Sequence, residues 1–94
     1  MKPVLEGTVA LVTGASSGIG AATATALAER GAAVALAARR GERLEALAAD
    51  IRAQGGTALV LECDVTDEGQ ATAAVERTVA ELGRLDTLDR KSVV

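Results

Sequence analysis

The sequence has no phenylalanine, tyrosine, tryptophan or histidine, and only one cysteine. Without aromatic rings, the chain has no anchor for stacking a nucleic-acid base or the ring of a ligand. Without histidine, it can offer neither a histidine base nor a histidine metal ligand, and we expect no metal site. The lone cysteine, Cys63, cannot form an internal disulfide, which fits a reducing compartment.

Strong charge of one sign and long apolar runs are also missing. The chain has 10 basic and 13 acidic residues, for a formal net charge of −3, and lacks the basic stripe that a nucleic-acid surface needs. Residues 1–7 lack the long apolar core of a signal peptide, and no apolar run approaches the length that spans a bilayer. We therefore expect a cytoplasmic protein whose partners are small molecules, with no nucleic acid and no membrane.

Alanine dominates what is present. The 94 residues suit one small domain at most, and 49% of them are apolar, but 21 are alanine. Alanine forms helix well and lets elements approach closely, but it buries little area per residue. The core of so small a chain therefore has little margin.

A glycine-rich segment, residues 13–20 (Thr-Gly-Ala-Ser-Ser-Gly-Ile-Gly), follows an apolar run and opens an alanine-rich stretch. Gly14 can take the backbone angles of a tight strand-to-helix turn, and Gly18 removes the side chain where a diphosphate must approach. Gly20 lets the helix pack closely on the strand. The helix N-terminus then offers N–H groups and a positive dipole end to the anion. The alternative is a turn that merely needs glycines, but the flanking pattern favours nucleotide binding.

The apolar pattern predicts three strand–helix units and the start of a fourth strand. The expected strands cover residues 8–13, 33–38, 57–61 and 85–88. The expected helices cover about 17–30, ending at a left-handed Gly31, about 42–54, and a third that begins at Thr66 or Asp67, with Gln70 placed for a capping-box contact, and ends at Gly83.

Each helix is expected to place one apolar face on a sheet. The residues expected on these faces are Ile19, Ala22, Ala26 and Leu27 in the first helix, Leu44, Leu47, Ala48 and Ile51 in the second, and Ala71, Val75, Val79 and Leu82 in the third. Alternating strands and helices with short connections give parallel strands joined by right-handed crossovers. The sequence thus predicts an α/β fold, the first half of a Rossmann-type doubly wound parallel sheet (βαβαβα plus the start of a fourth strand), with strand order 3-2-1-4.

These motifs resemble the N-terminal half of the short-chain dehydrogenase/reductase family over residues 5–88. Residues 13–20 have the family's T-G-x-x-x-G-x-G spacing, residues 63–65 (Cys-Asp-Val) match its D-V pair after the third strand, and residues 83–86 (Gly-Arg-Leu-Asp) match its approach to the fourth. The resemblance implies the cofactor-binding half of an NAD(P)(H)-dependent oxidoreductase that interconverts an alcohol and a carbonyl. Relatives often assemble as dimers or tetramers, so a full-length form is compatible with a homo-oligomer.

The resemblance also implies a set of cofactor-binding positions. These are Gly14, Ser16, Ser17, Gly18, Ile19, Gly20, Arg39, Arg40, Asp64 and Val65. Residues 16–19 would line the diphosphate and the adenosine ribose. Asp64 would accept a hydrogen bond from the adenine amino group, and the Val65 backbone would complete that pocket. The alternative for Asp64 is an acid that merely belongs to the loop or leads the next helix.

The two arginines after the second expected strand favour NADP(H) over NAD. An NAD enzyme holds the ribose 2′-hydroxyl with an acidic residue near the end of this strand. Here the strand ends in Ala38 and is followed by Arg39 and Arg40. A carboxylate would repel a 2′-phosphate, whereas a guanidinium can bind it with two hydrogen bonds. Arg39 is the better candidate, and the alternative is that both arginines are solvated surface charges.

The chain departs from the family beyond the fourth strand. The family's catalytic serine and its Tyr-x-x-x-Lys pair have no counterpart here, since the sequence has no tyrosine. We therefore assign no catalytic residue and expect the chain to be inactive alone. Cys63, with no second cysteine and no histidine beside it, is expected to be an inert thiol. The alternatives to an enzyme fragment are a non-catalytic nucleotide-binding module and an inactive gene fragment.

A boundary is expected near the C-terminus. We assign residues 1–88 to an NAD(P)-binding half-domain and residues 89–94 to a non-native tail, because Asp-Arg-Lys-Ser-Val-Val differs from the preceding strand in charge and pattern. The same six residues are encoded by a common short-read sequencing adapter before an in-frame stop, which indicates a truncated gene prediction. A natural short product with a divergent end is the alternative.

Overall fold

The computed structural model describes residues 6–15, 18–39, 41–64 and 66–89 of the chain. The elements are β1 (Val9–Thr13), α1 (Gly18–Glu29), β2 (Ala33–Ala38), α2 (Gly41–Ala53), β3 (Ala58–Glu62), α3 (Glu68–Leu82) and β4 (Thr87–Asp89). Their order is the predicted one. The first three strands and the three helices begin and end within two residues of the expected positions. Asp89, which the sequence assigns to the tail, is the last residue of β4.

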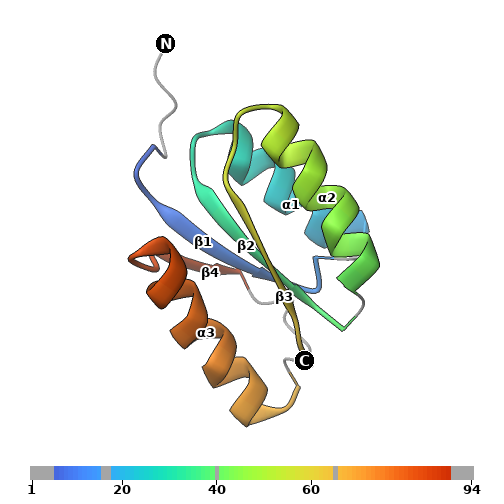
Figure 1. Cartoon of the computed structure of the whole chain (residues 1–94), viewed down its shortest axis with the longest axis vertical. Coiled ribbons are helices and arrows are strands. Elements are labelled where there is room, and N and C mark those ends of the chain that lie inside the picture. The colour runs from blue at the N-terminus through green and yellow to red at the C-terminus, as the bar shows by residue number, and fades with distance from the viewer. Residues whose placement is uncertain (1–5, 16–17, 40, 65, 90–94) are drawn as a thin grey trace.

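The strands form one parallel sheet in the order β3-β2-β1-β4, which confirms the predicted topology (Figure 1). In the register of the sheet, Leu36 of β2 lies opposite Val12 of β1 on one side and Val60 of β3 on the other. All five residues of β1 are buried. A strand that is apolar on both faces and buried throughout is typical of the centre of a parallel sheet.

Hydrogen bonds made by Asp86, just before β4, place that short strand beside β1. The N–H of Asp86 donates to the carbonyl oxygen of Val9 at 2.9 Å, and the N–H of Val9 donates to Asp86 Oδ2 at 2.8 Å. Asp86 Oδ1 also accepts from Arg84, at 2.6 Å from its terminal nitrogen. Residues 83–86, singled out in the sequence as a family motif, thus fix where the chain joins the sheet.

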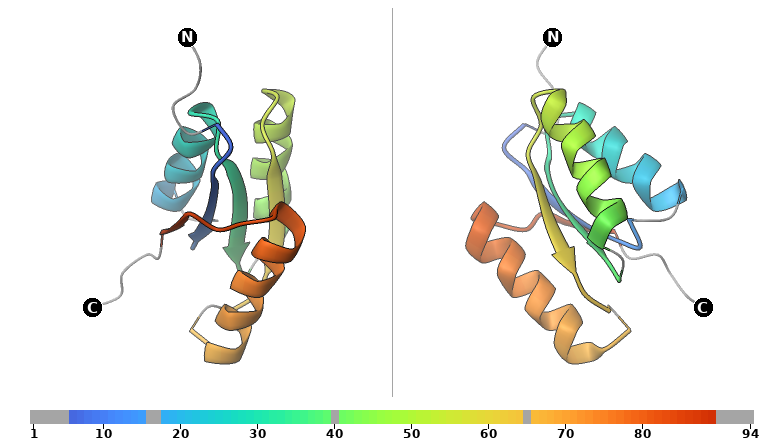
Figure 2. Two further views of the ribbon diagram at one scale, coloured as in Figure 1. Left: turned by 90° about the vertical axis from the view of Figure 1, so that its left-hand side faces the viewer. Right: turned by 45° about the vertical axis from the view of Figure 1, so that its right-hand side comes forward.

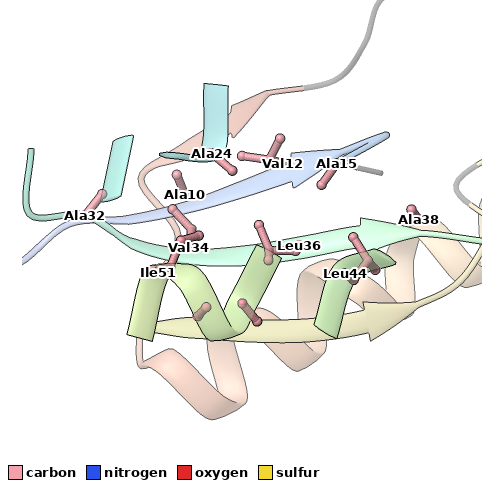
Figure 3. Close-up of a cluster of buried hydrophobic side chains, with 12 residues drawn as sticks. Ala10, Val12, Ala15, Ala24, Ala32, Val34, Leu36, Ala38, Leu44 and Ile51 are labelled. Carbon is pink, nitrogen blue, oxygen red and sulfur yellow. The ribbon is translucent and has the colours of Figure 1, made fainter. Parts of the chain in front are cut away.

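Two apolar clusters lie on opposite faces of the sheet because strand side chains alternate between faces. One cluster lies beneath α1 and α2 (Figure 3) and includes Val12, Val34, Leu36 and Leu44. The other lies beneath α3, where Leu61 and Ala74 meet the alanines of β2. Figure 2 shows the resulting layers, with the sheet between the α1–α2 pair and α3.

The predicted inward face is correct for α2 but only partly correct for α1, where Leu27 packs against the cluster and Ile19, Ala22 and Ala26 are exposed. In α2, Leu44 and Ile51 are buried, as expected. In α1, Ile19 is 75% exposed, and the buried residues are Gly20 and Ala24. The helix is so rich in alanine that its apolar pattern does not distinguish one face from another. Ala24, which is buried, and Leu27 face the cluster, whereas Gly20 allows a close approach to the turn after β1.

The predicted inward face is also only partly correct for α3, where Val75 and Leu82 pack against the second cluster. Val79 is 42% exposed, and Val75 is only half-buried, whereas Ala74 and Thr78 are buried. A buried threonine needs a hydrogen-bond partner, and the Thr78 hydroxyl donates to the carbonyl oxygen of Ala74 at 2.7 Å. Because its own helix satisfies the hydroxyl, Thr78 behaves as a core residue that hydrophobicity alone does not identify. The helix ends as expected at Gly83, whose φ is 88°.

Candidate functional site

The predicted cofactor-binding positions gather at one edge of the sheet. The turn after β1, the loop after β2 and the loop after β3 lie together at the carboxyl ends of these strands (Figure 2). Backbone hydrogen bonds join them: the N–H of Ala15 donates to the carbonyl oxygen of Ala37 at 3.3 Å, and the N–H of Cys63 donates to that of Ala38 at 2.9 Å. In open parallel sheets, ligands bind in the crevice at this edge.

Two glycines of the turn are required by the fold itself. Gly14 has a φ of 64°, a left-handed conformation that other residues adopt at a cost. A Cβ atom on Gly20 would lie 2.9 Å from the carbonyl carbon of Gly14 and 3.0 Å from Cα of Ala15. The close approach at Gly20 is therefore to the turn, rather than to the strand as the sequence analysis expected.

Gly18 has no such reason to be glycine. No described atom beyond its chain neighbours and the nearby backbone of its own helix lies within 4 Å of the position that a Cβ would occupy. The space beside its backbone therefore remains open at the first residue of α1. The described residues therefore give no packing reason for glycine at this position.

Ile19 lies next to this open space. Three quarters of its surface is exposed, which is unusual for isoleucine. An exposed apolar side chain beside the first turn of a helix suits a ligand that is partly apolar, such as a nucleoside. Four predicted positions, Ser16, Ser17, Arg40 and Val65, lie outside the described residues.

Asp64, which leaves the end of β3, is fixed by hydrogen bonds on three sides. Its Oδ1 accepts from the Thr66 hydroxyl at 2.6 Å and from the Thr66 N–H at 3.0 Å. Its N–H donates to Gln70 Oε1 at 2.8 Å, and its carbonyl oxygen accepts from the Asp67 N–H at 3.1 Å. The described contacts of the carboxylate all use Oδ1, which leaves Oδ2 for a ligand.

Gln70 departs from its predicted capping role. Asp67 caps α3 as expected, because its Oδ1 accepts from the Gln70 N–H at 3.1 Å. The Gln70 side chain does not return this bond to Asp67 and instead bonds the Asp64 backbone. Thr66 and Gln70 are thus supports of the candidate site that the sequence analysis missed. The signal was present as an Asp followed two residues later by Thr, a pattern typical of Asx turns.

The charges of Asp64 and Arg39 interact across the ends of β3 and β2. The Thr66 hydroxyl, and next its N–H, hold the pKa of the Asp64 carboxyl below its ordinary value, and the Arg39 guanidinium adds to this effect. Asp64 is therefore an ionised, acceptor-only group at neutral pH. Arg39 is exposed, so its guanidinium remains accessible to a ligand at this edge. The structure thus brings these two predicted site residues together.

Cys63 faces the cluster under α3 rather than the candidate site. It is half-buried among apolar residues. Burial, with a smaller contribution from the Asp64 charge, raises the pKa of its thiol. A thiol with a raised pKa is protonated at neutral pH and is a poor nucleophile.

Other features of the described residues do not compete with this site. A hollow of about 560 Å³ lies at the opposite, amino-terminal edge of the sheet and is lined by none of the predicted site residues. Within the described part of the chain, no three cysteine or carboxylate side chains gather as metal ligands would. No helix in the same part has the length and apolar character to cross a membrane.

Comparison with known proteins agrees with the geometry of this edge. A family model described as short chain dehydrogenase matches residues 8–90, which is most of the chain. The chain belongs to the short chain dehydrogenase family. This finding confirms the resemblance that the motifs indicate and the Rossmann-type fold.

Individual members of this family are similar over most of the chain. The A-factor type gamma-butyrolactone 1'-reductase (1S-forming) of Streptomyces virginiae is 50% identical over 88 residues, which cover 94% of this chain. A metagenomic short-chain oxidoreductase, solved in complex with NADP, is 43% identical over 97% of this chain, with a TM-score of 0.89. A 7α-hydroxysteroid dehydrogenase, solved with NADH and 7-oxo glycochenodeoxycholic acid, is 31% identical over 93%, with a TM-score of 0.88.

The chain is much shorter than these relatives. It spans 34% of the length of the Streptomyces reductase, 41% of the NADP-bound oxidoreductase and 34% of the hydroxysteroid dehydrogenase. The matched part is the one that carries the glycine turn and the ends of β1, β2 and β3.

Proposed function

We propose that this chain is the coenzyme-binding half of an NAD(P)(H)-dependent oxidoreductase that interconverts an alcohol and a carbonyl, with NADP(H) preferred over NAD(H). The observation that carries the proposal is the open backbone at Gly18, in a family whose solved members include NADP and NADH complexes. A nicotinamide coenzyme, when bound, supplies or accepts the hydride. The residues of this chain would bind and orient it.

The coenzyme diphosphate would be held at the start of α1. Gly14 shapes the turn, Gly20 brings the helix against it, and Gly18 leaves room for the phosphate oxygens. The positive end of the helix dipole favours an anion at this point. Ser16 and Ser17 belong to the proposed contact set, and the exposed Ile19 would cover the adenosine side.

The adenosine would lie across the ends of β2 and β3. Asp64 Oδ2 is the proposed acceptor for the adenine amino group, and the backbone of Val65 would complete the adenine pocket. The hydrogen bonds that Thr66 and Gln70 make to Asp64 support this role, because they fix the acceptor before a ligand arrives.

Arg39 is the proposed partner of a ribose 2′-phosphate, with Arg40 beside it in the sequence. No acidic residue occupies the end of β2, where an NAD enzyme holds the 2′-hydroxyl. An exposed guanidinium at this point can form two charge-assisted hydrogen bonds to a phosphate. We therefore favour NADP(H), and NAD(H) is the weaker coenzyme in this proposal.

The proposal assigns binding but no catalytic residue to this chain. By family resemblance, the groups that give or take the substrate proton are a serine and a Tyr-x-x-x-Lys pair, and the sequence contains no tyrosine. Hydride transfer to a substrate would belong to a full-length form. A non-catalytic nucleotide-binding module is the second candidate, and a downstream gene sequence that encodes the Tyr-x-x-x-Lys pair would decide against it.

Replacement of Gly18 by alanine separates ligand binding from folding. A Cβ at this position meets no described atom, and alanine is favoured over glycine in a helix by about 0.5–1 kcal/mol, so the urea midpoint should stay the same or rise. The same Cβ would occupy the space of the diphosphate, so the affinity for NADP⁺ measured by calorimetry should fall by about tenfold or more.

The matched control is Gly69→Ala in the first turn of α3, where a Cβ makes only an ordinary contact with Asp67. This variant should gain similar helix stability and bind NADP⁺ as the parent does. Equal affinities in the parent and in Gly18→Ala, or no coenzyme binding by the folded parent, would contradict the proposal.

A further inference from the structure

Glu62 is a carboxylate at the candidate site that neither the motifs nor the proposed contacts include. It is the last residue of β3 and lies opposite Ala38, the last residue of β2, in the register of the sheet. Ala38 immediately precedes Arg39, the proposed partner of the 2′-phosphate. Residues opposite each other on neighbouring strands point to the same face, so Glu62 points toward the side that α1 and α2 cover.

The Glu62 carboxylate lies against the first residue of α2. If Gly41 carried a Cβ, that atom would collide with Glu62 Oε2 and lie 3.2 Å from Glu62 Cδ. Glu62 is the described residue that a Cβ at Gly41 would meet within 4 Å, beyond the chain neighbours and the nearby helix backbone. A negative charge at the start of a helix is favourable, and Glu42 adds a second one in the same turn.

This position matters because the same loop carries Arg39. A 2′-phosphate held by Arg39 would come near two carboxylates, because Asp64 interacts with the Arg39 charge and Glu62 lies beside Ala38 and Gly41, which are close to Arg39 in the chain. The positive end of the α2 dipole, which would otherwise attract the phosphate, is already offset by Glu62. Since both Glu62 and Arg39 are exposed, their opposing effects act through solvent and are modest in size.

We propose that Glu62 is a specificity-determining residue that opposes Arg39 and weakens the preference for 2′-phosphorylated coenzymes, so that NAD(H) competes with NADP(H) at this site. This inference rests on the proposed coenzyme-binding function. A nucleotide without the 2′-phosphate places no charge near Arg39 and Glu62, so its affinity does not depend on Glu62. A nucleotide with the 2′-phosphate is repelled.

The test uses the adenosine halves of the two coenzymes as probes, adenosine 2′,5′-bisphosphate and adenosine 5′-monophosphate, titrated into the 94-residue chain and followed by calorimetry. Glu62→Gln keeps the shape of the side chain and removes its charge. The affinity for the bisphosphate should rise about threefold at physiological salt, the size expected for one exposed charge near a phosphate. The affinity for the monophosphate should not change, and the gain should shrink as salt is added.

Two variants separate charge from structure. Glu62→Asp keeps the charge and should keep the parent's ratio of the two affinities. Asp50→Asn removes an exposed carboxylate from the far part of α2 and should also leave the ratio unchanged. If Glu62 merely supported α2, Glu62→Gln would alter the urea midpoint or weaken both probes together.

The outcomes distinguish this inference from the proposed function. Binding of both probes with the same affinity ratio in the parent and in Glu62→Gln would overturn the role of Glu62 and leave coenzyme binding intact. Failure of the folded parent to bind either probe would overturn both. A selective gain for the bisphosphate supports both.

Discussion

At the residue scale, the three motif glycines share a residue type but not a cause. Gly14 is a glycine because its backbone is left-handed, and Gly20 because a Cβ there would collide with the turn. Both reasons are visible in the folded chain alone. At Gly18, a Cβ would meet no described atom beyond the chain neighbours and the nearby backbone of its own helix. A sequence pattern gives all three the same symbol, so only the structure shows that Gly18 differs from the other two, which is why we propose the ligand contact there.

The residues around Asp64 lead to a prediction about its ionisation. Replacing Thr66 by valine keeps the shape but removes the hydroxyl that contributes most to lowering the pKa of Asp64. We expect this pKa to rise toward its ordinary value, though not fully, because the Thr66 N–H still donates. A carbon-13 NMR titration of the Asp64 carboxyl measures the change.

The sign of the accompanying stability effect follows from linkage. The folded-state pKa of Asp64 is depressed, so its hydrogen bonds stabilise the fold above the unfolded-state pKa, and this stability is lost as the pH falls through the folded-state pKa. The Thr66→Val chain should therefore lose less stability on acidification than the parent. Thr72→Val, at another exposed threonine, is the control. An unchanged Asp64 titration in Thr66→Val would refute the role of this hydroxyl.

At the scale of elements, strands and boundaries were predictable, but helix faces were predictable only in part. The order and limits of β2, α2 and β3 follow from apolar runs separated by glycine, and the structure confirms them to within one residue. The stripe on α2 was also predictable, because leucine and isoleucine stand out against charged neighbours. In α1 the apolar residues are nearly all alanine, and in α3 the buried Thr78 satisfies its own hydroxyl.

Two isoleucines give a direct test of these faces. Ile51 in α2 is 3% exposed and belongs to the cluster under α1 and α2, whereas Ile19 in α1 is 75% exposed. Ile51→Ala should lower the free energy of unfolding by about 2–5 kcal/mol, as deletions from a packed core do. Ile19→Ala should change it by less than about 0.5 kcal/mol. Urea unfolding measures both, and a large loss for Ile19→Ala would mean that α1 packs as the sequence pattern first indicated.

Site positions at the ends of elements were predictable from spacing, but their supports were not. The T-G-x-x-x-G-x-G pattern places the glycines at the start of α1, and the Asp after β3 falls at the same edge, as parallel strands require. Gln70 was predicted to be a capping residue because it follows Asp67 by three residues, which is a pattern read from the local sequence alone. Its bond to the backbone of Asp64 depends on the path of the whole β3–α3 loop. Glu62 was missed because its place at the site comes from the pairing of β3 with β2.

At the scale of the whole molecule, the sheet has β4 at one edge, and only β1 pairs with it in the described structure. An unpaired strand edge offers backbone N–H and carbonyl groups to another chain. We therefore expect the 94-residue chain to self-associate in solution or to be poorly stable. Sedimentation velocity over a range of concentrations should show species larger than the monomer. A monomer at every concentration, with one cooperative urea transition, would contradict this expectation.

The edge formed by the glycine turn, Arg39 and Asp64 is the proposed binding site for a dinucleotide coenzyme. The most direct measurement is a titration of isotopically labelled chain with NADP⁺, followed by amide NMR shifts. We predict saturable shifts concentrated at Gly14, Gly18 and Gly20, with further shifts at Arg39 and Asp64. Shifts confined to the opposite edge, around the hollow beside Gly31 and Gly55, or no shifts at all in the folded chain, would contradict the account.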